Sequence, residues 1–141
     1  MRSFEVKPIK GGNVPAAKTA PRKALRILVV DDNLDQVHTL AYLLKDSGHH
    51  VDFAINGIVA LDLAKRIRPN VVLLDIGLPD TNGTTVARNL RGMPGFENVY
   101  IVAITGRVFT RGEALEAGFD ELLTKPIDFG ALDALLGTRQ E

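Results

Sequence analysis

The sequence predicts an α/β fold, namely a doubly wound sheet of five parallel strands with five helices. From Leu25 onward, short apolar segments alternate with segments of helical periodicity. Such βα units, joined by right-handed crossovers, form a parallel sheet with helices on both faces. Three of the apolar segments, 25–30, 70–74 and 100–104, show no polar alternation, which is typical of strands buried on both faces. A chain of 141 residues is long enough for one such domain.

The expected strands differ in polarity. The second strand begins with His49 and His50 and alternates apolar and polar residues. Because alternation indicates one exposed face, we expect this strand at an edge of the sheet. In chain order, the strands are predicted near 25–30, 49–55, 70–75, 99–104 and 120–124.

The expected helices follow the strands. Gly48 and Gly118 lie where the first and fourth helices should end, a position that glycine favours. The first helix repeats apolar residues at helical spacing, which predicts one buried face made of Leu34, Val37, Leu40, Ala41 and Leu44. The helices are predicted near 34–47, 57–67, 83–91, 111–117 and 128–136.

Composition excludes several classes of protein. Hydrophobic residues make up 45% of the chain and charged residues 24%, as in ordinary globular proteins. No apolar run approaches the roughly 20 residues that span a bilayer, and the first residues lack the apolar core of a signal peptide. With no cysteine, disulfides and thiolate metal sites are excluded. We therefore expect a cytoplasmic protein with no membrane contact.

Residues 1–24 are predicted to be a flexible leader that precedes a domain over 25–141, because Pro8, Pro15 and Pro21 interrupt any periodicity. The whole chain has 17 basic and 17 acidic residues. The leader holds six of the basic and one of the acidic residues, which leaves 11 basic and 16 acidic residues for the domain. An acidic domain argues against direct binding of DNA.

Polar side chains follow four of the expected strands. Asp31 and Asp32 come after the first strand, Asp75 ends the third, Thr105 ends the fourth, and Lys125 follows the fifth. The carboxyl ends of parallel strands meet at one edge, where open α/β sheets place their sites. Three clustered carboxylates favour a hard divalent cation, and an ammonium group nearby suits a phosphoryl group. The sequence therefore predicts a cation and phosphoryl site at this edge.

Each of these residues also has a purely structural interpretation. An aspartate at a strand end often forms a turn, and the cap of the first helix could be Asp31, Asp32 or Asn33. The functional interpretation is favoured because neither role requires all of these side chains to meet at one edge. The three histidines lack the spacing of metal ligands and are predicted to lie at the surface; they are His38, His49 and His50.

Four sequence segments occur in a fixed order, each at an expected strand end. They are Val29-Val30-Asp31-Asp32-Asn33, Leu73-Leu74-Asp75-Ile76-Gly77-Leu78-Pro79-Asp80-Thr81-Asn82-Gly83, Ala103-Ile104-Thr105-Gly106, and Ala117-Gly118-Phe119-Asp120 with Leu123-Thr124-Lys125-Pro126. With these segments, the chain resembles the receiver domains of bacterial two-component response regulators from Leu25 to about Leu136. The resemblance implies a flavodoxin-like fold of the receiver type.

The resemblance also implies roles for individual residues. Asp75 corresponds to the phospho-acceptor, and Asp31 and Asp32 would hold Mg²⁺ together with Asp75 and the backbone carbonyl of Gly77. Receiver domains take their phosphoryl group from a histidine kinase or a histidine phosphotransfer protein. They catalyse only their own phosphorylation and dephosphorylation, so the resemblance implies no other enzymatic activity.

Two further positions match the part of the family's site that binds the phosphoryl group. Lys125 would pair with the phosphoryl oxygens, and Thr105 would hydrogen-bond to one of them after transfer. The family's Lys-Pro peptide bond is typically cis, which makes the bond before Pro126 a candidate for that geometry.

The chain departs from the family pattern in three places. Leu122 occupies the position of an aromatic residue that acts as a switch, and an aliphatic side chain cannot replace it. The stretch from Thr105 to Lys125 is about two residues short, which predicts a shorter fourth helix or loop. Gly77 offers no side chain to orient water, so we expect Arg107, in the loop with Val108 and Phe109, to tune the lifetime of the acyl phosphate.

No effector domain is expected after the last helix, which ends near Leu136. The chain is therefore expected to signal through a protein partner, to act as a phosphate sink or shuttle, or to be a receiver excised from a longer hybrid kinase. A receiver-like scaffold that does not switch is a further alternative because of Leu122. A metal-dependent phosphatase is disfavoured because Gly77 stands where such enzymes need a second acid. Whether the chain forms a dimer is left open.

Overall fold

The computed structural model describes residues 22–106 and 110–140. Strands and helices alternate strictly along this part of the chain. The strands are β1 (Arg26–Val30), β2 (His50–Ala54), β3 (Val71–Asp75), β4 (Tyr100–Thr105) and β5 (Glu121–Thr124). The helices are α1 (Leu34–Asp46), α2 (Gly57–Ile67), α3 (Gly83–Arg91), α4 (Arg111–Ala117) and α5 (Phe129–Gly137). The predicted positions are correct to within about two residues, which is the usual uncertainty of element ends.

The five strands form one parallel sheet in the order β2-β1-β3-β4-β5. This confirms the predicted doubly wound fold of five strands and five helices. The alternating strand β2 lies at an edge, as expected, and the three apolar strands lie inside the sheet. All residues of β3 and β4 are buried, because helices cover both of their faces.

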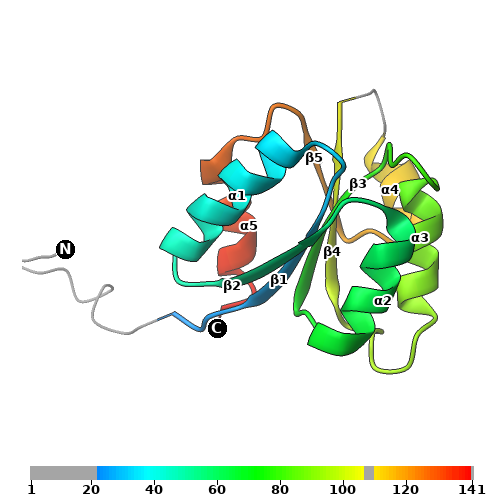
Figure 1. Ribbon diagram of the computed structural model, residues 1–141, viewed down its shortest axis with the longest axis horizontal. Coiled ribbons are helices and arrows are strands. Elements are labelled where there is room, and N and C mark those ends of the chain that lie inside the picture. Colours follow the sequence, from blue (N-terminus) through cyan, green and yellow to red (C-terminus); the bar gives the residue numbers. More distant parts are fainter. Residues whose placement is uncertain (1–21, 107–109, 141) are drawn as a thin grey trace, which may run out of the picture.

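The helices form two layers on either side of the sheet, with α1 and α5 on one face and α2, α3 and α4 on the other (Figure 1). Each layer closes its own hydrophobic core. Alternate residues of the inner strands point to opposite faces, so Leu28 belongs to the core under α2–α4 and Ile27 to the core under α1 and α5. The two cores hold the sheet rigidly between them, which fixes the positions of the strand ends.

Caps at the helix ends explain why the connections are short. Asparagine side chains accept a backbone N–H at the start of α1, α2 and α3, while Thr110 and Glu113 form a reciprocal capping box at α4. At the end of α4, Gly118 has a φ of 102°, a left-handed conformation that costs glycine little. At seven residues, α4 is the shortest of the described helices.

Two sequence-based predictions about packing were wrong. Leu34 is 48% exposed, because the first turn of α1 extends past the edge of the core that holds Val37, Leu40 and Leu44. His49 is buried rather than at the surface. Its Nδ1 accepts a hydrogen bond of 3.1 Å from the backbone N–H of Leu25, which satisfies both buried groups.

The two ends of the described chain meet near the start of β1. The backbone N–H of Lys23 donates to the carbonyl of Gln140, and the Gln140 side chain donates to the carbonyl of Lys23. Most of the expected leader, residues 1–21, lies outside the described residues, so its flexibility stays a prediction. Within the described residues, no helix combines the length and the apolar character needed to cross a membrane.

Candidate functional site

Three carboxylates gather at the carboxyl edge of the sheet. Because Val30 of β1 pairs with Leu74 of β3, the residues that follow them, Asp31 and Asp75, become neighbours. Asp32 completes the group, and one carboxylate oxygen from each of the three residues lies within 4.8 Å of the others. Asp31 and Asp75 are buried, whereas Asp32 is exposed. The cluster therefore opens to solvent on the side of Asp32.

Lys125 places its ammonium group against this cluster. Its Nζ lies 3.1 Å from Oδ2 of Asp31 and 3.2 Å from Oδ2 of Asp75. The side chain reaches this point from the end of β5, past the end of β4. The Lys125–Pro126 peptide bond is cis, the geometry that the resemblance to receiver domains implies. One cation thus bridges two buried carboxylates and offsets part of their mutual repulsion.

Thr105 is buried at the end of β4, between the strands that carry Asp75 and Lys125. Its backbone carbonyl accepts a hydrogen bond of 2.8 Å from the N–H of Lys125. On the other side, the carbonyl of the preceding Ile104 accepts from the N–H of Ile76 at 3.0 Å. These backbone bonds fix the relative positions of the three strand ends, so the site rests on the sheet itself.

The segment after Asp75 folds back tightly onto the strand end. The N–H of Gly77 donates to Oδ1 of Asp75 at 3.1 Å, and the N–H of Gly83 donates to the carbonyl of Ile76 at 2.8 Å. A Cβ atom at Gly83 would lie only 2.6 Å from the carbonyl oxygen of Asp75. Glycine at this position therefore allows the start of α3 to approach the strand end closely.

Asp80 has a positioning role that the sequence analysis missed. Its two carboxylate oxygens accept hydrogen bonds from the N–H groups of Gly57 and Ile58, at 2.8 and 3.0 Å. These bonds, chiefly the one from Gly57, lower the pKa of Asp80. They tie the segment after Asp75 to the start of α2. The acid within Pro79-Asp80 marks a turn, but the sequence gives no sign of a partner more than twenty residues away.

The electrostatics of the cluster favour a cation. Burial raises the pKa of Asp31, although the N–H of Asn33 and the ammonium group of Lys125 act in the opposite direction. Burial alone would lower the pKa of Lys125, but the hydrogen bonds to Asp31 and Asp75 together outweigh it and raise the pKa. The donor set consists only of oxygen atoms, which is what Mg²⁺ prefers. The three carboxylates therefore fit a divalent cation.

Some polar residues at the strand ends also have the structural roles of helix capping and turn formation. Asn33, not an aspartate, caps α1, and Oδ1 of Asp31 accepts a hydrogen bond from the N–H of Asn33. Asp31 thus shapes the turn and belongs to the cluster at the same time. Leu122 is partly buried and packs against the core under α2–α4. Arg107, Val108 and Phe109 lie outside the described residues, so the proposed tuning by Arg107 stays a prediction.

Comparison with known proteins identifies the family. Residues 27–136 match the family model described as the response regulator receiver domain. The chain belongs to this family. It is a receiver domain of a two-component response regulator, and such domains accept phosphoryl groups from histidine kinases or phosphotransfer proteins. Receiver domains bind Mg²⁺ at an acidic pocket, and the three carboxylates of Asp31, Asp32 and Asp75 form a group that could hold such an ion.

Relatives of this receiver domain occur in chains of different length. The transcriptional regulatory protein PrrA of Mycobacterium leprae is 38% identical over 109 residues, which cover 77% of this chain and 47% of PrrA. An uncharacterized 14.6 kDa protein of Leptolyngbya boryana is 36% identical over 104 residues, covering 72% of this chain and 79% of that protein. The receiver domain therefore spans about half the length of PrrA but most of the smaller relative.

A solved structure supports the same assignment. The response regulator receiver domain, described as CheY-like, from Methylobacillus flagellatus superposes with a TM-score of 0.74 at 30% identity. The match covers 82% of this chain and 98% of that one. The receiver domain therefore shares the fold of this solved relative over nearly the whole length of that relative.

Proposed function

We propose that this receiver takes a phosphoryl group from a phosphohistidine onto Asp75. The donor is the phosphohistidine of a histidine kinase or of a histidine phosphotransfer protein. A carboxylate oxygen of Asp75 attacks the phosphorus atom, the phosphorus–nitrogen bond breaks, and its electron pair returns to the imidazole, which takes up a proton. The observation that carries the proposal is the bridge from Lys125 Nζ to Asp31 and Asp75, next to an exposed third carboxylate.

The surrounding groups suit this transfer because a carboxylate is a modest nucleophile. Phosphoryl transfer then depends on alignment and on neutralising charge. We propose that Asp31, Asp32, Asp75 and the carbonyl of Gly77 hold Mg²⁺, which when bound neutralises charge on the acids and the phosphoryl oxygens. Lys125 can exchange its hydrogen bond to Asp75 for one to a phosphoryl oxygen, since its stem is flexible.

The proposed signal starts at Thr105. An acyl phosphate on Asp75 adds roughly two negative charges and new hydrogen-bond acceptors beside the hydroxyl group of Thr105. Because Leu122 packs against the core, the relay through an aromatic side chain is replaced by a change at the surface of α4 and the residues before it. A downstream protein partner would recognise that surface. We do not expect direct DNA binding, because the domain is acidic.

The same leucine favours a second candidate, a phosphate sink that accepts the phosphoryl group without a distant structural change. Its partly buried aliphatic side chain has no polar end that could follow Thr105. In both candidates the only catalysis is the receiver's own phosphorylation and dephosphorylation. The two candidates differ in whether α4 responds to phosphorylation of Asp75.

The test is incubation with Mg²⁺ and acetyl phosphate, followed by intact mass and peptide mapping. We expect one added phosphoryl group on Asp75, none in the Asp75→Asn variant, and none when a chelator removes the metal. Asp52→Asn, an exposed acid on β2, is the matched control and should be modified as in the wild type. Amide shifts reaching residues 111–117 would support a switch, and their absence a sink. Modification at another residue would refute the proposal.

A further inference from the structure

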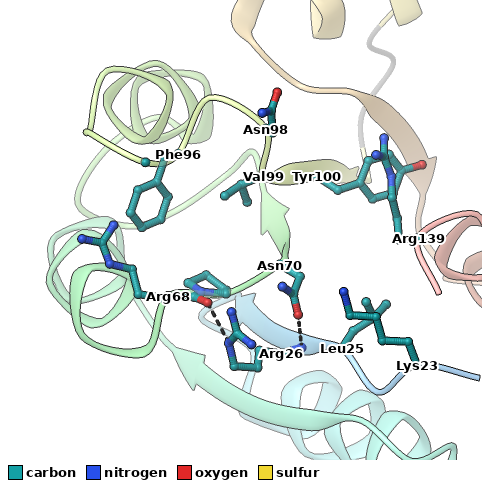
Figure 2. Close-up of a pocket in the computed structure, with 12 residues that line it drawn as sticks. Lys23, Leu25, Arg26, Arg68, Asn70, Phe96, Asn98, Val99, Tyr100 and Arg139 are labelled. Carbon is teal, nitrogen blue, oxygen red and sulfur yellow. Dashed lines mark hydrogen bonds between the residues drawn. The ribbon is translucent and has the colours of Figure 1, made fainter. Parts of the chain in front are cut away.

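A pocket lies at the amino ends of the strands, on the opposite side of the domain from the acidic cluster at their carboxyl ends. It has a volume of about 330 Å³ and lies between the starts of three strands (Figure 2). Arg26 begins β1, Asn70 precedes β3, and Tyr100 begins β4. Arg68 at the end of α2 and Arg139 after α5 complete the walls. Residues distant in the sequence thus form one hollow that has no part in the proposed phosphotransfer.

The lining of this pocket is strongly basic. Lys23, Arg26, Arg68 and Arg139 contribute four cations, and no aspartate or glutamate lines the pocket. Within residues 22–106 and 110–140, none of the four forms an ion pair. The two acids that act electrostatically on Tyr100 are already paired, Asp120 with Arg91 and Glu121 with Arg111. The positive charge of the pocket is therefore not neutralised by the described part of the chain.

Neutral partners hold three of these cations in place. Nε of Arg26 donates to the carbonyl of Arg68 at 2.8 Å, and Nη1 of Arg68 donates to the carbonyl of Pro94 at 3.1 Å. The Arg68 guanidinium also lies 5.3 Å from the ring centre of Phe96, and that of Arg139 lies 4.1 Å from the ring centre of Tyr100. Carbonyl groups and aromatic faces orient a guanidinium without cancelling its charge. Such cations are preorganised for an external anion.

We propose that this pocket binds a small anion that carries two or more phosphate groups. Guanidinium groups match phosphate oxygens with paired hydrogen bonds, and several terminal nitrogens of Arg26 and Arg139 have no partner among the described residues. A single phosphate would reach only part of a cation set spread around the pocket wall. A volume near 330 Å³ falls in the range of small-molecule sites. A short inorganic polyphosphate and a nucleoside polyphosphate share this chemistry.

The test is calorimetric titration of the whole chain with tripolyphosphate, in magnesium-free buffer of fixed ionic strength. We expect saturable binding of one anion per chain, with amide shifts centred on residues 23–26, 68–70 and 139. Inorganic phosphate should bind at least about tenfold more weakly, because it meets fewer cations. A parallel titration with ATP shows whether a nucleoside adds affinity to that of the phosphate chain. Whether or not it does, ATP is expected to bind through its phosphate groups.

Variants assign the binding to the pocket. Lys23→Gln and Arg139→Gln should each weaken tripolyphosphate binding by about tenfold, since each removes charged hydrogen bonds. Arg88→Gln removes one exposed charge from α3, outside the pocket, and should leave the affinity unchanged. The Asp75→Asn variant should bind tripolyphosphate with the affinity of the wild type. Binding at the basic pocket can therefore be tested separately from phosphorylation of Asp75.

Five results would overturn the proposal. They are absence of saturable binding, equally tight binding of inorganic phosphate, an equal loss of affinity in Arg88→Gln, shifts centred on the acidic cluster, and tighter binding of a short DNA duplex than of tripolyphosphate. The last would identify a nucleic-acid surface instead of a pocket for small anions.

Discussion

Replacement of Gly83 by alanine tests whether the close approach of α3 to the end of β3 positions Asp75. A Cβ atom at residue 83 would lie 2.6 Å from both the carbonyl oxygen of Asp75 and Cα of Ile76. Ordinary contact begins at 3.4 Å, so the two backbone segments must separate by about 0.8 Å. Both atoms belong to the backbone and cannot rotate away. The strain therefore falls on the residue that would accept the phosphoryl group.

The expected magnitudes follow from this displacement. Overpacking of this kind costs about 1–3 kcal/mol, and the higher helix propensity of alanine returns at most about 1 kcal/mol. We expect Gly83→Ala to lower the free energy of unfolding by about 1–2 kcal/mol in urea denaturation. A shift approaching 1 Å at a reacting group can slow the reaction about a hundredfold. We expect phosphorylation by acetyl phosphate, followed by intact mass, to slow by about tenfold or more.

Gly112→Ala is the matched control. Gly112 also lies in the first turn of a helix, but the nearest atom to its added Cβ is Oγ1 of Thr110, at 3.9 Å. This variant should be as stable as the wild type or more stable by up to about 1 kcal/mol, with an unchanged phosphorylation rate. If Gly83→Ala and Gly112→Ala had the same stability and the same phosphorylation rate, the close approach of α3 would not be what positions Asp75.

Three other changes test separate parts of the structure. Lys125→Met leaves Asp31 and Asp75 without their cation, so the free energy of unfolding measured without divalent ions should fall by about 1–3 kcal/mol. Added Mg²⁺ should restore part of this loss. Unchanged stability would contradict a stabilising bridge from Lys125 to the two carboxylates. Burial lowers the pKa of His49 in the folded protein, so on acidification the imidazole takes up a proton more readily in the unfolded state. The free energy of unfolding should therefore fall as the pH drops below about 6.5, by up to about 1.4 kcal/mol per pH unit. In urea titrations, the His49→Gln variant should lose this dependence of stability on pH, whereas the His38→Gln variant should keep it. If the stability of both variants changed equally with pH, the role of the buried His49 would be ruled out. Asp80→Asn should slow phosphorylation while leaving its site at Asp75, and a rate equal to that of the wild type would show that the tie to α2 is not needed.

The sequence was sufficient to predict the elements of this fold. Apolar runs such as Val71–Leu74 mark buried strands, and the polar residue that ends each run falls at one edge of a parallel sheet. Asp31, Asp75 and Lys125 could therefore be brought together without coordinates. These inferences depend on local patterns and on a topology that has few alternatives.

Features that depend on contacts between distant segments were not predicted. The imidazole of His49 is buried and accepts the N–H of Leu25, and the carboxylate of Asp80 accepts N–H groups at the start of α2, a helix that precedes it in the chain. The basic pocket brings Arg26, Arg68 and Arg139 together, yet no spacing in the sequence relates them. Leu34 shows the opposite error, since its helical periodicity is correct but the core ends before its turn. Periodicity gives the face of a helix but not the extent of the core that it covers.

In the proposed function, Asp75 receives a phosphoryl group within a single site formed with Asp31, Asp32, Thr105 and Lys125. The most direct test is a crystal structure grown with Mg²⁺ and beryllofluoride, a mimic of the phosphoryl group. We expect beryllium bonded to a carboxylate oxygen of Asp75, the metal between the three carboxylates, and fluorine atoms in contact with Lys125 and Thr105. Beryllofluoride bound at another residue, or an ammonium group of Lys125 turned away from a modified Asp75, would contradict the proposed function.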